Sequence, residues 1–124
     1  MADEFTMTGL LKIDKGFKQD TKNVSNLRLD QTGDGSVGGG QNVGTSAEAI
    51  DLGDVSTLGL YFFRNLDDTN FVEIGQDVGG GGFEAFIKLK PGEFSVGRFA
   101  VLAGTLQAKA DTAAVELQYV IYED

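Results

Sequence analysis

Apolar and polar residues alternate with a period of two through most of the second half of the chain. Residues 83–89 (FEAFIKL) place four apolar side chains on one face and two charged ones on the other, and residues 114–122 (AVELQYVIY) repeat the pattern. This alternation is typical of half-buried β-strands. Further strands are predicted at residues 58–64, 71–75, 94–103 and 106–110.

Turn residues separate these runs. Residues 90–93 read KPGE, where the proline presets φ at the first central position and the glycine accepts the positive φ of a type II turn. The six residues 65–70 between two predicted strands suit a hairpin connection. Residues 32–44 are so rich in glycine that we predict a loop there.

The first part of the chain is less regular. Residues 5–13 alternate weakly, with Phe5 and Met7 in phase, and residues 14–23 are polar and poorly patterned. Residues 25–31 and 46–52 could each form a strand. We therefore predict an N-terminal arm or irregular segment over residues 1–30 and a β-sandwich domain over residues 31–124.

The fold class follows from the number of short strands. About eight of them, with turn signals every 8–12 residues and no helical pattern of ten or more residues, predict an all-β sandwich or barrel. We favour a single β-sandwich or jelly-roll-like domain, although periodicity alone does not select a topology.

Composition narrows the chemistry. The 124 residues include no cysteine and no histidine, which removes disulfides, thiol catalysis, the commonest general base and the commonest transition-metal ligand. The net charge of −9 is divided evenly between the two halves of the chain, so no direct contact with nucleic acid is expected. There is no signal-peptide pattern and no apolar run long enough to span a membrane.

Asp67 and Asp68 are the first candidates for catalysis, and they admit three readings: an acid pair, a metal site or a turn. Neighbours on a strand point to opposite faces, whereas paired-carboxylate catalysis needs two groups that converge. No histidine, lysine or clear nucleophile lies nearby in the sequence. We favour a turn in which the side chains bind their own backbone, and we expect no enzyme, with a small hydrolase as the weakest alternative.

The glycine-rich stretches resemble two ligand-binding motifs. Residues 33–38 spell G-x-G-x-x-G, but GGQNVG follows where a dinucleotide site needs a helix. Residues 30–35 partly match a calcium loop, yet the twelfth position is Gln41 and no helices flank it. Residues 79–82 lack the Lys-Ser/Thr that follows a phosphate loop. We favour surface loops and expect no cofactor and no metal, an incidental cation at residues 30–35 being the alternative.

Five residues are candidates for contact with a partner. Arg64 and Arg98 lie in or beside apolar strands, where each could pair with a carboxylate at a subunit contact or simply face solvent. Phe5, Met7 and Leu10 are apolar side chains of the expected arm, which could reach a neighbouring subunit or remain a flexible terminus. The phenylalanines outnumber what a small sandwich must hide, which also indicates an interface.

About half of the chain resembles a set of small structural proteins of tailed bacteriophages. The matching motifs are RNLDDTNFVEIG at residues 64–75, LKPGE at 89–93 and ADTAAVELQYVI at 110–121. The resemblance implies a jelly-roll or β-sandwich virion component, most often a capsid decoration (cement) protein. It further implies a trimer on the capsid exterior, bound to the major capsid protein and assembled in the host cytoplasm.

A second function stays open at this point. Some proteins of this kind are head-fibre or tail parts, and glycine-, asparagine- and aspartate-rich loops with exposed aromatics would suit a host- or glycan-binding module. The chain has no tryptophan, the residue that most favours sugar stacking, which counts against this alternative.

Overall fold

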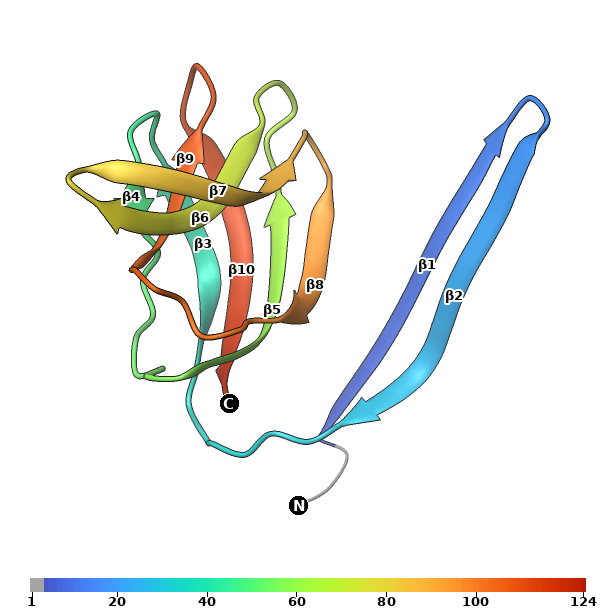
Figure 1. The fold of residues 1–124 in the computed structure, drawn as a ribbon, viewed down its shortest axis with the longest axis horizontal. Helices are drawn as coiled ribbons and strands as arrows, with labels where there is room; N and C mark the ends of the chain where they lie inside the picture. Colours follow the sequence, from blue (N-terminus) through green and yellow to red (C-terminus); the bar gives the residue numbers. More distant parts are fainter. Residues whose placement is uncertain (1–3) are drawn as a thin grey trace. The chain divides into compact units, whose positions relative to one another are not determined.

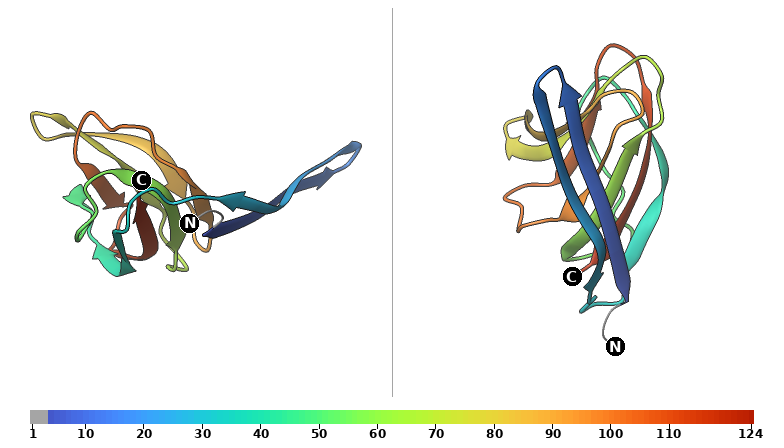
Figure 2. Two further views of the ribbon diagram at one scale, coloured as in Figure 1. Left: turned by 90° about the horizontal axis from the view of Figure 1, so that it is seen from below. Right: turned by 90° about the vertical axis from the view of Figure 1, so that its right-hand side faces the viewer.

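A computed structural model describes residues 4–124, and the chain divides into two compact units between Thr32 and Gly33. The described residues are all-β and contain no helix. No helix long and apolar enough to cross a membrane is therefore found among them. The first unit is a two-stranded antiparallel hairpin made of β1 (Phe5–Lys15) and β2 (Lys18–Leu29), drawn in blue in Figures 1 and 2. The second unit contains the eight strands that follow.

These eight strands form two four-stranded sheets packed face to face (Figure 1), so the predicted all-β sandwich is confirmed. The first sheet has the order β3-β10-β5-β8 and the second the order β4-β9-β6-β7. The strands are β3 (Ser36–Val43), β4 (Glu48–Ala49), β5 (Leu58–Asn65), β6 (Val72–Gly79), β7 (Gly82–Leu89), β8 (Phe94–Arg98), β9 (Leu106–Ala110) and β10 (Val115–Glu123).

The inner faces of the two sheets supply the core. Phe63 of β5 and Tyr119 of β10 stack with ring centroids 6.3 Å apart, and Ile74 of β6 and Leu106 of β9 are fully buried in the facing sheet. Because these side chains alternate with exposed ones along each strand, the period-two pattern of the sequence corresponds directly to the two faces of each sheet.

The chain changes sheet at every connection of the second unit except the one between β6 and β7. Such alternation is the path of Greek-key sandwiches and agrees with a jelly-roll-like topology. It also shows that one prediction was wrong: residues 65–70 join β5 of one sheet to β6 of the other and do not close a hairpin. The turn at residues 90–93 is confirmed, with Gly92 at φ 80° and Glu93 N–H donating to Lys90 O at 3.0 Å, and it too crosses between the sheets.

The glycine-rich stretch is the second correction. Residues 36–43 form β3, an edge strand paired with β10 from Val115↔Val43 to Tyr122↔Ser36, although a loop was predicted. Backbone pairing with β10, and not the β-propensity of its own side chains, accounts for this strand. Gly38 lies so close to β10 that a Cβ there would meet Tyr119 O at 3.0 Å and Val120 Cγ2 at 3.1 Å.

The hairpin corrects the expectation of an irregular first segment. Its strands meet through a two-residue turn, Gly16-Phe17, with Gly16 at φ 60°, as a type II′ turn requires at its first central position. The strands over residues 14–23 were not predicted, because both faces of the hairpin carry charged side chains there and the sequence shows no alternation of apolar and polar residues. Whether this segment acts as an arm stays a prediction.

Two predicted strands are shorter than expected. The run over residues 94–103 ends as a strand at Arg98, because Phe99 turns into the core, with its ring centroid 4.5 Å from that of Tyr61 and 6.1 Å from that of Phe63. The run over residues 46–52 keeps only Glu48 and Ala49 as a strand.

Candidate interaction surfaces

The corner at residues 65–70 is a closed hydrogen-bond network. The amide of Asn65 is fully buried and donates to Asn70 O at 2.8 Å and Leu89 O at 3.0 Å, while its Oδ1 accepts from Asp67 N–H at 2.8 Å. Asp67 in turn accepts the N–H groups of Thr69 at 3.0 Å and Asn70 at 2.6 Å. The network ties β5, the corner and the end of β7 together.

The two aspartates of this corner therefore have separate structural contacts. The N–H groups of Asn70 and Thr69 lower the pKa of Asp67, because they stabilise its charged form. Asp68 accepts the hydroxyl of Thr69, at 3.0 Å. The predicted turn, with side chains bonded to their own backbone, is confirmed for Asp67.

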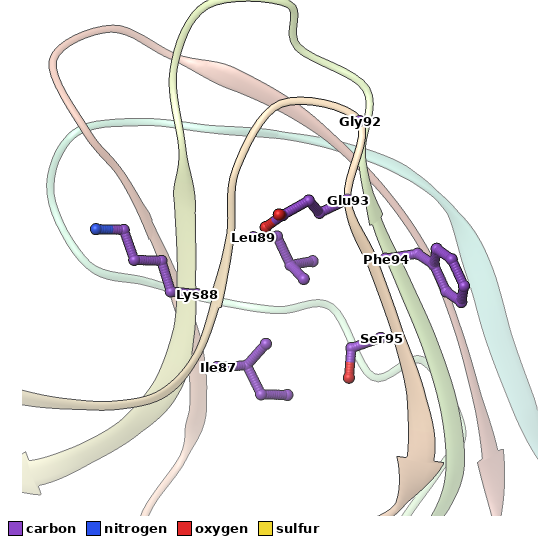
Figure 3. Close-up of a pocket in the computed structure, with 7 residues that line it drawn as sticks. All are labelled: Ile87, Lys88, Leu89, Gly92, Glu93, Phe94 and Ser95. Carbon is purple, nitrogen blue, oxygen red and sulfur yellow. The ribbon is translucent and has the colours of Figure 1, made fainter. Parts of the chain in front are cut away.

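An open depression of about 460 Å³ lies where β7 ends and β8 begins (Figure 3). Ile87 and Ser95 point into it, whereas Lys88 and Phe94 point away. Its acid, Glu93, accepts Lys90 N–H at 2.7 Å and so belongs to the turn. The side chains that line the depression include one carboxylate, that of Glu93, so it brings no pair of carboxylates together.

The glycine-rich stretches have a structural role in the backbone. Gly79, Gly80 and Gly81 all have positive φ in the turn between β6 and β7. Near residues 30–35, Glu123 accepts Gly35 N–H at 3.2 Å and Ser56 Oγ at 2.7 Å, and these donors lower its pKa. Among residues 4–124 no group of three histidine, cysteine or acidic side chains is placed to hold a metal ion.

The hairpin carries an apolar face. Cross-strand pairing puts Phe5 opposite Leu29, Met7 opposite Leu27 and Gly9 opposite Val24, and Leu11 and Ile13 continue the same side of β1. We call the following side chains the hairpin face: Phe5, Met7, Leu11, Ile13, Val24, Leu27 and Leu29. Leu11 is 75% exposed, and the described residues of this unit form no third strand that could cover the face. The opposite side of the hairpin is polar apart from Leu10.

A bulge keeps this face continuous. Val24 and Leu27 are three apart in sequence and would lie on opposite sides of a regular strand. The register shift between Met7 and Gly9 inserts one residue into β2, and Asn26 takes φ 55° there, with its N–H donating to Thr8 Oγ1 at 3.1 Å. The result is seven apolar side chains on one side.

Two lysines stand at the tip of the hairpin face. Lys15 and Lys18 are directly opposite each other next to the turn, a placement that costs stability when no anion lies between them. The nearest acid on that side, Asp20, already pairs with Lys22 at 2.8 Å. Phe17 between the two lysines is fully exposed. The tip is thus both basic and apolar.

The sandwich has an apolar surface of its own on the outer side of the β3-β10-β5-β8 sheet. Phe62 is paired with both Val96 and Val120, and its ring stacks on that of Phe94 with centroids 6.1 Å apart. We call Phe62, Leu66, Phe94, Val96 and Val120 the sheet patch. Phe94 is 60% exposed. A depression lined by Gly39, Gly40, Phe62, Leu66, Glu116, Gln118, Tyr119 and Val120 opens beside it.

The structure separates the five candidate contact residues. Phe5 and Met7 belong to the hairpin face, but Leu10 lies on the opposite side. Arg64 is exposed beside the sheet patch, paired with Phe94 and Gln118. Arg98 forms an ion pair with Asp124 of its own chain at 2.8 Å.

Sequence reasoning missed most of the hairpin face. Leu11 and Ile13 follow Phe5 and Met7 at even spacing and could have been found from the sequence. Val24 could not, because the bulge sets its side.

Comparisons of the chain with protein-family models, with curated proteins and with solved structures give no match. The resemblance to phage structural proteins therefore remains a prediction from the motifs.

Proposed function

We propose that this chain is a structural protein of a bacteriophage particle, a decoration or cement protein that binds the outside of the capsid shell and stabilises it. Its partner is the major capsid protein, it acts as a trimer without catalysis, and it is assembled into the virion in the host cytoplasm. The motifs at residues 64–75, 89–93 and 110–121 support this family of roles.

The observation that carries the proposal is the uncovered hairpin face. Contiguous exposed apolar surface of this kind marks interaction sites in folded proteins. A protein that binds its neighbours in a shell needs such a surface. Here the sandwich is closed around its own core, while the hairpin exposes Leu11, Ile13, Val24 and Leu27 of its apolar face.

The main experiment is quantitative mass spectrometry of purified particles from the encoding phage. We expect the chain at copy numbers close to that of the major capsid protein, and we expect shells without it to open at lower temperature. Its absence from particles, or a genome without capsid genes, would overturn the proposal.

The copy number in particles also distinguishes a cement protein from the alternative, a head-fibre or tail module. A few copies per particle would favour a fibre or tail module over cement. A glycan array would then test it, since a fibre that binds hosts through sugars should give hits and a cement protein none.

A further inference from the structure

The two units of the chain differ in the sign of their net charge. Residues 5–29 carry five basic and two acidic side chains, whereas residues 33–124 carry five basic and fourteen acidic ones. The hairpin strands therefore have a net charge of +3 and the sandwich one of −9. Counting by halves of the chain hides this difference, because the first half adds acidic residues of the sandwich to the basic ones of the hairpin.

From this we infer that the hairpin face of one copy docks on the sheet patch of a second copy, through contacts between apolar side chains flanked by opposite charges. This inference and the proposed function both use the hairpin face, but their tests are separate. Self-association in solution tests the contact between copies, and the copy number in purified particles tests the role on the particle.

The two surfaces match in chemistry. The hairpin face is an apolar stripe that ends in the opposed Lys15 and Lys18, and an anionic partner would relieve their repulsion. The sheet patch is an apolar strip with Glu116 in the depression on one side of it and Arg64 beside Phe94 on the other. The charge match therefore places the lysine tip over the depression that contains Glu116. Opposite fields of this kind speed association and fix the register of a contact.

The spacer between the units favours exchange between copies. Leu29 is the end of β2, and Gly35 is held by β10, with Glu123 N–H donating to Gly35 O at 2.8 Å. Short connections of this kind between a detachable element and its domain promote swapping of that element between identical chains. A two-stranded hairpin is also only marginally stable alone, so a covering partner would stabilise it.

Sedimentation velocity over a range of concentrations tests the inference on the full chain. Leu11→Asp on the hairpin face should weaken self-association by about tenfold or more, while Leu10→Asp, its neighbour on the opposite side, should leave it within about twofold. Lys15→Glu with Lys18→Glu should also weaken it, and Lys12→Glu on the opposite side should not. A chain that stays monomeric throughout, or equal losses from Leu11→Asp and Leu10→Asp, would overturn the inference.

Cysteine cross-linking identifies the receiving surface, since the natural chain has no cysteine to interfere. A Leu11→Cys chain mixed with a Phe94→Cys chain should form a disulfide-linked pair under mild oxidation, and Leu10→Cys in place of Leu11→Cys should not. Failure of the first pair to link would exclude the sheet patch as the receiver. A chain with both cysteines that links only internally would show docking on its own sandwich and also overturn the inference.

Discussion

The sandwich and the hairpin use the same alternation of apolar and polar residues, but only the sandwich covers the apolar side. In the sandwich each sheet hides the inner face of the other, and Phe63, Ile74 and Leu117 have no exposed surface. In the hairpin the corresponding side chains form a face without a second layer. Alternation of apolar and polar residues therefore predicts that a strand has an apolar side, but it does not predict which part of the structure covers that side.

This difference has an energetic consequence. An apolar side chain of the sandwich core contributes to folding through burial and packing, of the order of 25 cal/mol for each Å² of apolar surface removed from water. An apolar side chain of the hairpin face contributes little of this until a partner covers it. Substitutions in the two units should therefore separate stability from association.

The largest expected effect is at Phe63. Phe63→Ala should lower the free energy of unfolding by about 4 kcal/mol, because it leaves a cavity between the two sheets. Urea denaturation followed by circular dichroism measures it. Phe17→Ala at the hairpin tip is the matched control, with an expected change within about 0.5 kcal/mol. Similar losses from both would contradict the division between a covered and an uncovered unit.

The next effect is at the buried corner. Asn65→Ala should cost about 3 kcal/mol, because it leaves the buried carbonyls of Asn70 and Leu89 without their donor. The same urea experiment serves, with the exposed Asn42→Ala as the control. If both asparagines proved equally dispensable, the corner would not be what joins the two sheets.

A smaller effect, confined to the hairpin, is expected at the bulge. Asn26→Val should destabilise the β1–β2 pairing by about 1 kcal/mol, since a β-branched residue is disfavoured at φ 55°. Asn26→Gly should be tolerated. Amide hydrogen exchange should show faster exchange in β1 and β2 for the valine variant and unchanged exchange in β10. Faster exchange throughout the sandwich would mean that the units are not independent.

The smallest effect is on the acid side of the stability curve. Asp67 and Glu123 have folded-state pKa values below their ordinary values of 3.8 and 4.5. Their contribution is therefore complete above those values and is lost as the pH falls through the folded-state pKa. Asp67→Asn and Glu123→Gln should flatten the decline in unfolding midpoint below about pH 4.5. A decline as steep as that of the natural chain would rule out these two carboxylates as its cause.

The strands that sequence predicts best are those whose two sides differ most. β7 and β10, and the turn at residues 90–93, follow from alternation and from proline and glycine chemistry. β3 did not, because its glycines carry no pattern and its position depends on backbone pairing with β10, far away in the sequence. The corner at residues 65–70 was misread as a hairpin because loop length does not reveal which sheet the next strand joins.

The interaction surfaces show the same limit. Phe5 and Met7 were recognised, but Leu10 was grouped with them although Leu11 shares their side. Strand phase separates these two leucines once β1 is known to be regular. Val24 needed more, since only the positive φ of Asn26 brings it onto the hairpin face. The sheet patch combines side chains from three strands and from the corner after β5, an arrangement that no local pattern contains.

The place of β10 has a consequence for how the chain matures. β10 lies between β3 and β5, so these two strands have no backbone partner in common until residues 115–123 have been synthesised. The hairpin, by contrast, needs only residues 5–29 and can close long before. Non-local pairing of this kind slows folding. During synthesis the residues of the hairpin therefore leave the ribosome before the sandwich can close. Because the hairpin is only marginally stable alone, its apolar face stays exposed to solvent during that interval.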